Sequence, residues 1–91
     1  MLTNELIISG RVQGVGYRYY AKTIADELNI KGTVRNLSDG NVKVIAQTDE
    51  DTLDQFIVRL KVPQHSFMRI NSITSCEIDI DKVYQTFSIV Y

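Results

Sequence analysis

The sequence is poor in the residues on which several classes of protein depend. Its 91 residues include one cysteine (Cys76), one histidine (His65) and no tryptophan. A single cysteine cannot form an internal disulfide and is typical of a reducing compartment. No spaced cluster of histidine and cysteine is available for a metal, so we expect neither metal nor cofactor. We expect the Cys76 thiol, inside a predicted strand, to be buried and inert, and His65 to be a plain surface residue.

An excess of one charge and long apolar runs are also missing. Ten lysines and arginines balance eleven aspartates and glutamates, which leaves a net charge of −1. No overall field attracts nucleic acid or a membrane, so neither is an expected partner and any anion site must be local. No apolar run approaches the ~20 residues that span a bilayer, and the first residues do not form a signal peptide. We therefore expect a cytoplasmic protein, and a monomer.

The hydrophobic period changes along the chain in the order strand, helix, strand, strand, helix, strand, with an extra strand at the end. We predict strands over residues 5–12, 33–37, 42–47, 70–80 and 86–91. We predict one helix over residues 17–29 and a second that begins within residues 48–51 and stops at Val62 and Pro63.

This element order predicts an α+β fold, a ferredoxin-like two-layer sandwich with two helices on one face of an antiparallel sheet. No linker, repeat or change of composition divides the sequence, so residues 1–91 are expected to form a single domain. The fold hosts many functions, including RNA binding and small-ligand regulation, and therefore decides none of them.

The most informative stretch, residues 10–18, joins the first predicted strand to the first helix. Gly14 and Gly16 allow positive φ angles, and successive N–H groups in such a loop can converge on an anion. The helix would begin with Tyr17 and Arg18, which puts a cation where the helix dipole costs it roughly 0.3–1 kcal/mol. A bound anion would remove this conflict. The alternative is a tight turn with a solvated Arg18.

Two motifs resemble those of a known family. Residues 10–18 read Gly-Arg-Val-Gln-Gly-Val-Gly-Tyr-Arg and resemble the acylphosphatase signature, a Val-Gln-Gly-Val loop followed by an aromatic residue and arginine. Residues 32–36, Gly-Thr-Val-Arg-Asn, followed by Asp39, Gly40 and Val42, are similar to the second signature of that family. The resemblance spans essentially the whole chain.

The sequence departs from the family pattern at three places. Thr33 stands where many members carry an aromatic residue, and Gln47 and Thr48 replace a glycine that often ends the third strand. Residues 62–65 lack the usual glycine-proline pair. None of these departures lies in the first motif, so they bear on efficiency and substrate preference more than on the reaction.

The resemblance implies hydrolysis of the carboxyl-phosphate bond of acyl phosphates to a carboxylate and inorganic phosphate. It also implies that inorganic phosphate, the product, inhibits the reaction. It implies that Arg18 grips the phosphate with its planar fork, and that Asn36 orients the attacking water. It also implies a cradle of backbone N–H groups that hold the phosphate, from Gln13, Gly14, Val15, Gly16, Tyr17 and Arg18.

Other interpretations stay open at this point. The same loop would suit a phosphate- or nucleotide-binding module without catalysis, in which Asn36 would only hydrogen-bond the adjacent turn. A ferredoxin-like RNA-binding domain would require a basic sheet face with exposed aromatic residues, which the sequence does not indicate. The chain could also be a domain of a larger maturation protein, although the initial methionine and the final strand favour a free-standing enzyme.

Overall fold

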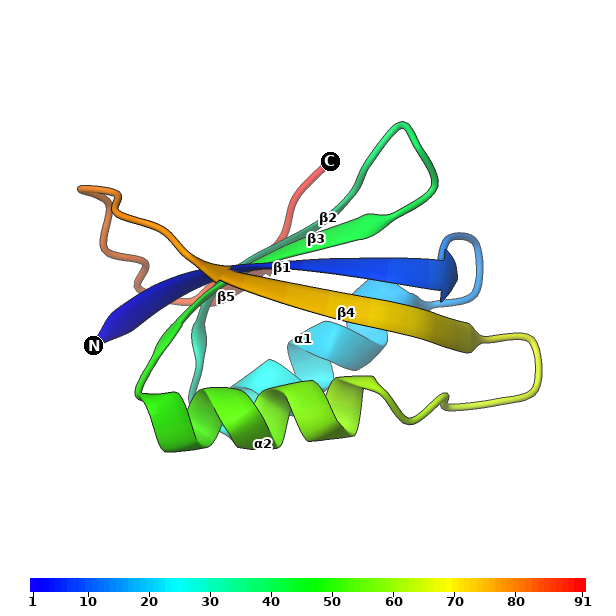
Figure 1. Ribbon diagram of the computed structural model, residues 1–91, viewed down its shortest axis with the longest axis horizontal. Helices are drawn as coiled ribbons and strands as arrows, with labels where there is room; N and C mark the ends of the chain where they lie inside the picture. Colours follow the sequence, from blue (N-terminus) through cyan, green and yellow to red (C-terminus); the bar gives the residue numbers. More distant parts are fainter.

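In the computed structural model, which describes all 91 residues, both helices pack on one face of a five-stranded sheet (Figure 1). The elements are β1 (Leu2–Arg11), α1 (Tyr17–Glu27), β2 (Lys31–Asn36), β3 (Val42–Thr48), α2 (Glu50–Leu60), β4 (Arg69–Glu77) and β5 (Phe87–Ile89). The predicted element order and the ferredoxin-like α+β fold are confirmed, with boundaries that move by a few residues. Neither helix is long and apolar enough to cross a membrane.

The strand order of the sheet is β4-β1-β3-β2-β5. Three neighbouring pairs are antiparallel, but β5 runs parallel to β2. The sheet is therefore mixed, whereas the sequence analysis predicted an antiparallel one. The reason is that β4 and β5 occupy opposite edges, so the chain crosses the sheet between them instead of closing a hairpin.

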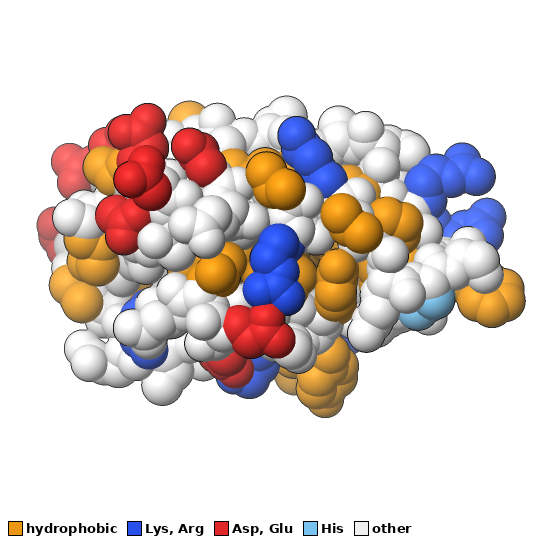
Figure 2. All heavy atoms as spheres, turned by 90° about the horizontal axis from the view of Figure 1, so that it is seen from below, with side chains coloured by type: hydrophobic (Ala, Val, Ile, Leu, Met, Phe, Trp, Pro, Cys, Tyr) orange, Lys and Arg blue, Asp and Glu red, His pale blue; other side chains and the backbone are white.

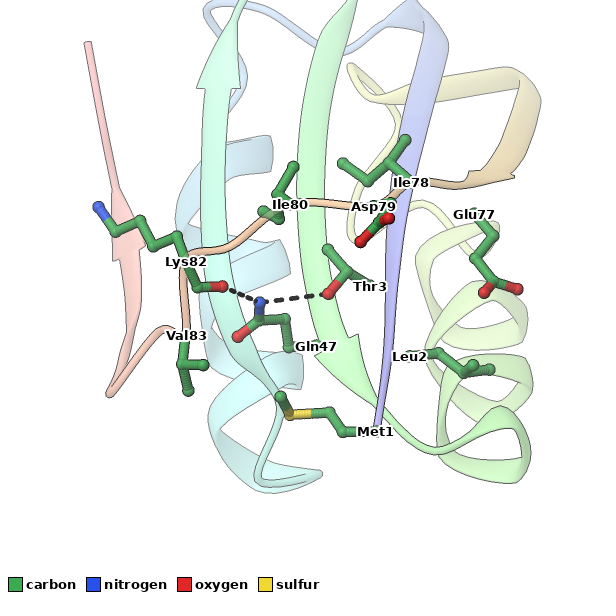
Figure 3. A pocket seen from close by; sticks show the side chains of 10 residues that line it. All are labelled: Met1, Leu2, Thr3, Gln47, Glu77, Ile78, Asp79, Ile80, Lys82 and Val83. Atoms are coloured by element: carbon green, nitrogen blue, oxygen red, sulfur yellow. Dashed lines mark hydrogen bonds between the residues drawn. The ribbon is translucent and has the colours of Figure 1, made fainter.

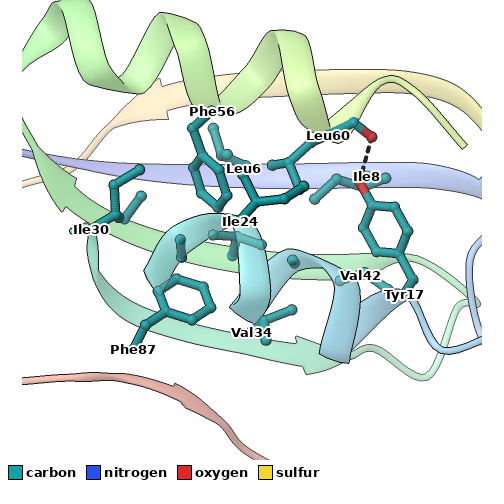
Figure 4. Packing of buried hydrophobic residues seen from close by; sticks show 14 of the residues in the cluster. Leu6, Ile8, Tyr17, Ile24, Ile30, Val34, Val42, Phe56, Leu60 and Phe87 are labelled. Carbon is teal, nitrogen blue, oxygen red and sulfur yellow. Dashed lines mark hydrogen bonds between the residues drawn. The ribbon is translucent and has the colours of Figure 1, made fainter. Parts of the chain in front are cut away.

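The core lies between the sheet and the helices, and Figure 4 shows its largest side chains from β1, α1 and α2, among them Leu6, Ile8, Ile24 and Phe56. All of these are at least 99% buried. Burial of one such side chain stabilises the fold by about 1.5–3 kcal/mol. The Tyr17 hydroxyl donates a hydrogen bond of 2.8 Å to the carbonyl of Leu60, which ties the start of α1 to the end of α2.

The connection between β4 and β5, residues 78–86, crosses the sheet face opposite the helices (Figure 3). Gln47, one of the departures from the family pattern, is buried beneath it. Its Nε2 donates to the Thr3 hydroxyl and to the Lys82 carbonyl, and its Oε1 accepts from the Tyr84 N–H. The Gln47 amide therefore holds this connection on the sheet. A glycine at this position could not form these hydrogen bonds, because it has no side chain.

Strand β4 forms one edge of the sheet and is mostly exposed. It ends at Glu77, three residues before the predicted Ile80, because the chain turns there to cross the sheet. The prediction that Cys76 is buried is wrong, since its side chain is exposed. Cys76 pairs with Glu5 at the open edge, where it has a neighbouring strand on one side only.

Candidate active site

Three connections meet at one end of the molecule: the β1–α1 loop, the β2–β3 turn and the α2–β4 connection (Figure 1). In the first of them Gly14 and Gly16 have φ angles of 74° and 83°, a left-handed conformation that other residues adopt only with strain. Gly16 directly precedes α1 and provides no side-chain cap for it. The backbone at the start of α1 therefore lacks the usual side-chain acceptor.

The backbone N–H groups of this loop have no partners within the protein. None of those from Gln13 to Arg18 donates a well-formed hydrogen bond, and no acidic residue lies in the first turn of α1. Helix α2 differs, because the Asp49 carboxylate accepts from the Thr52 N–H at 2.8 Å. That bond holds the pKa of Asp49 below its ordinary value. The first helix thus presents a group of unpaired donors where the second has an acidic cap.

Most of this loop borders a small cavity of about 230 Å³, lined by Val12, Gly14, Gly16, Tyr17, Arg18, Tyr19 and Asn36 but not by Gln13 or Val15. Its volume corresponds to the liquid volume of roughly eight water molecules, enough for a phosphoryl group and an attacking water. Of the residues expected at the site, Gly14, Gly16, Tyr17, Arg18 and Asn36 meet here. The sequence analysis did not find Val12 and Tyr19, whose apolar and aromatic side chains carry no chemical signal of their own.

Arg18 is half-buried as a residue, and its guanidinium takes part in none of the ion pairs of the chain. Its Cζ atom lies 4.9 Å from the centre of the Tyr91 ring, within the range of a cation–π interaction. Stacking on an aromatic ring orients the cation without neutralising it. Tyr91 is far from the loop in sequence, and no local pattern could have indicated this contact.

Asn36 is the last residue of β2 and makes no side-chain hydrogen bond within the protein. Its Oδ1 atom is buried without a partner, which is an unfavourable state for a polar atom. The neighbouring turn is held in another way: Gln13 Nε2 donates to the carbonyls of Leu37 and Asn41, both at 2.8 Å. The turn-capping role considered for Asn36 therefore has no hydrogen bond that would support it.

Two side chains of the loop pack on the core. Tyr17 is buried in the core, and this burial, with a smaller effect of Tyr20, raises the pKa of its phenol. Only its backbone can meet a ligand of the loop. The Val15 side chain packs on the core, and its carbonyl oxygen lies 3.0 Å from Nε2 of His65. His65 is exposed, as expected, but it contacts the loop and is more than a plain surface residue.

The charge distribution favours an anion at this end. In Figure 2 arginine and lysine side chains lie at the end of the molecule that carries the β1–α1 loop, whereas acidic side chains gather at the opposite end.

A larger hollow of about 480 Å³ lies under the 78–86 connection, where Gln47 is hydrogen-bonded to Thr3 and Lys82 (Figure 3). Because those polar groups are already paired, the smaller cavity with its unpaired donors is the stronger candidate for the site.

The sheet order, the two helices and the unpaired donors define a ferredoxin-like α+β protein with a candidate anion pocket at the start of its first helix. Residues 4–89 match the family model described as Acylphosphatase. The chain belongs to the acylphosphatase family. It is 45% identical to an acylphosphatase of Ligilactobacillus salivarius over the full length of both chains. The family suggested by the two motifs is confirmed, and with it the expectation that the chain is an enzyme.

Solved structures agree with this assignment. The chain is 36% identical to the protein in the crystal structure of acylphosphatase from Bacillus subtilis. The two structures match over the full length of both chains with a TM-score of 0.90. The crystal structure of T. kodakarensis HypF, 28% identical, matches with a TM-score of 0.88, but this chain covers only 12% of it. The same fold therefore occurs both as a chain of similar size and inside a much longer one.

Proposed function

We propose that the protein hydrolyses the carboxyl-phosphate bond of acyl phosphates in the cavity between the β1–α1 loop and Asn36. The backbone N–H groups from Gln13 to Arg18 bind the phosphoryl oxygens, and the fork of Arg18 bonds two of them at once. The observation that carries this proposal is the group of unpaired N–H donors beside an arginine without an ion-pair partner. Such donors favour the charge that spreads over the phosphoryl oxygens during transfer.

In this mechanism the Asn36 amide orients a water molecule in line with the bond that breaks. The water oxygen forms a bond to phosphorus, while the bond from phosphorus to the acyl oxygen breaks and its electron pair leaves with the carboxylate. The proton of the water passes to a phosphoryl oxygen, so the products are a carboxylate and inorganic phosphate. A carboxylate leaves without protonation, and no general acid is needed. Positioning and electrostatics then supply the rate.

Hydrolysis of benzoyl phosphate, followed by its absorbance, tests this proposal. We expect turnover that survives EDTA and competitive inhibition by inorganic phosphate. Arg18→Ala should abolish most of the activity. Arg11→Ala is the matched control, because Arg11 is an exposed arginine at the end of β1 and does not line the cavity. Equal activity in both variants would contradict the role of Arg18, and recovery of EDTA-treated protein by magnesium would contradict the metal-free mechanism.

Binding without catalysis would give a different result. Phosphate would then raise the melting temperature of the parent and not of the Arg18→Ala variant, but benzoyl phosphate would stay intact. At ~100 times the dissociation constant, phosphate should add about 2.7 kcal/mol to the free energy of unfolding. Melting in phosphate and in chloride at equal ionic strength measures this gain.

We also propose that the active form is a cytoplasmic monomer. Size-exclusion chromatography with light scattering measures its mass and tests the oligomeric state.

A further inference from the structure

The contact between His65 and the β1–α1 loop has a definite direction. Nδ1 of His65 lies 3.2 Å from the backbone N–H of Phe67, which can only donate, so Nδ1 is the acceptor. In the neutral ring the proton is therefore on Nε2. This atom lies 3.0 Å from the carbonyl oxygen of Val15, which can only accept. His65 thus donates a hydrogen bond to the loop.

The backbone segment that carries this ring is held at two places. The backbone of the α2–β4 connection is closed by a hydrogen bond of 3.1 Å from the Met68 N–H to the His65 carbonyl. The Tyr20 hydroxyl donates to the Val62 carbonyl at 2.8 Å and joins the same connection to α1. With its backbone held and its Nδ1 bonded to Phe67, the His65 ring can determine the orientation of the peptide group that it contacts.

The orientation of that peptide group matters for the cradle. The chain has no cis peptide bonds, so the N–H of Gly16 points opposite to the Val15 carbonyl and away from His65. Gly16 lines the cavity, and its N–H has no acceptor in the protein. If the peptide group turned over, it would present a carbonyl oxygen to the phosphate. The peptide group lies between Val15 and Gly16, and the conformational freedom of Gly16 permits such a rotation.

We infer that His65 is a positioning residue of the phosphate cradle: by binding the Val15 carbonyl it keeps the Gly16 N–H directed at the phosphate. This inference rests on the proposed function. It also gives a role to residues 62–65, which depart from the family pattern. The Gly16 N–H would contact the phosphate both before and during transfer, so its loss should raise KM and the inhibition constant of phosphate more than it lowers kcat.

Two near-isosteric variants separate the two hydrogen bonds of the ring. In His65→Asn the side-chain oxygen replaces Nδ1 and keeps the bond to Phe67, but nothing reaches Val15. In His65→Gln the amide nitrogen replaces Nε2 and restores the donor to Val15. We expect His65→Asn to weaken phosphate inhibition and to raise KM by about 3- to 10-fold, with kcat within about 2-fold of the parent. We expect His65→Gln to stay close to the parent in all three constants.

The Gly16 amide signal in NMR spectra gives a readout that does not depend on turnover. In phosphate-free buffer we expect one sharp signal for the parent and for His65→Gln, and a shifted or broadened one for His65→Asn. Unchanged constants and an unchanged signal in His65→Asn, or a His65→Gln variant as impaired as His65→Asn, would overturn the inference. Failure of the proposed function is seen separately, because the parent would then neither hydrolyse benzoyl phosphate nor respond to Arg18→Ala.

Discussion

Replacement of Asn36 by alanine should separate catalysis from stability. The amide makes no hydrogen bond in the protein, and a buried polar atom without a partner costs about 1–3 kcal/mol. Its removal offsets the packing that the shorter side chain loses, so we expect the free energy of unfolding to change by no more than about 0.5 kcal/mol. In a domain of this size that is a shift of at most about 4 °C in melting temperature.

The effect of the same change on catalysis should be far larger. Loss of one preorganised polar group at the reacting centre lowers kcat by about 100- to 1,000-fold. The inhibition constant of phosphate should stay near the parent value, because the amide serves the water and not the phosphate. Turnover of benzoyl phosphate, phosphate inhibition and a thermal melt on one preparation measure all three effects.

Asn36→Asp is the matched variant, since it keeps the shape of the side chain and adds a negative charge. We expect it to lose turnover as well, and also to weaken phosphate inhibition by repulsion. An alanine variant with kcat within a few-fold of the parent and a large fall in melting temperature would refute the reasoning. Asn36 would then support the turn that follows β2.

Three further predictions concern other contacts. Arg18→Lys should lower kcat/KM by at least about 10-fold, because a lysine keeps the charge but not the fork, whereas Arg11→Lys should leave it unchanged. Tyr17→Phe should lower the free energy of unfolding in urea by about 1–2 kcal/mol, because the buried Leu60 carbonyl loses its donor. Burial raises the pKa of Tyr17, so the parent should lose stability as the pH rises above the ordinary tyrosine value of 10.0, and the variant should lack this loss. Asp49→Ala should lower the melting temperature at neutral pH. The hydrogen bond from the Thr52 N–H lowers the pKa of Asp49, so the difference should disappear as the pH falls well below 3.8.

The sequence predicted the parts of the fold that depend on local pattern. The apolar stripe of α1 and the alternation in β3 indicated both elements, because each periodicity corresponds to one buried face. The parallel pairing of β5 and the path of residues 78–86 were not predictable, since both depend on contacts across the sheet. Ile45 and Gln47 are buried for this reason, although they lie on the face away from the helices.

The candidate site likewise has one part that the local sequence predicted and another that depends on contacts between distant residues. Gly14, Gly16 and Arg18 lie within one short stretch, where the missing acidic cap of the helix could be read directly from the sequence. The contacts of Tyr91 with Arg18 and of His65 with Val15 join residues that are distant in the chain. An exposed histidine and a tyrosine near the end of a chain carry no local signal, so only the folded structure brings them to the loop.

The two hydrogen bonds of Gln13 limit how the β2–β3 turn can change in length. Turns at the tip of a hairpin usually accept insertions, and the tip of this one is exposed. Here the carbonyls of Leu37 and Asn41 must both stay within reach of one amide group. An added residue would move the two carbonyls apart, so Gln13 could no longer tie the β1–α1 loop to the turn. Homologues that keep this glutamine should therefore have a turn of constant length. A peptide tag inserted there would harm the enzyme even though the tip itself touches no substrate.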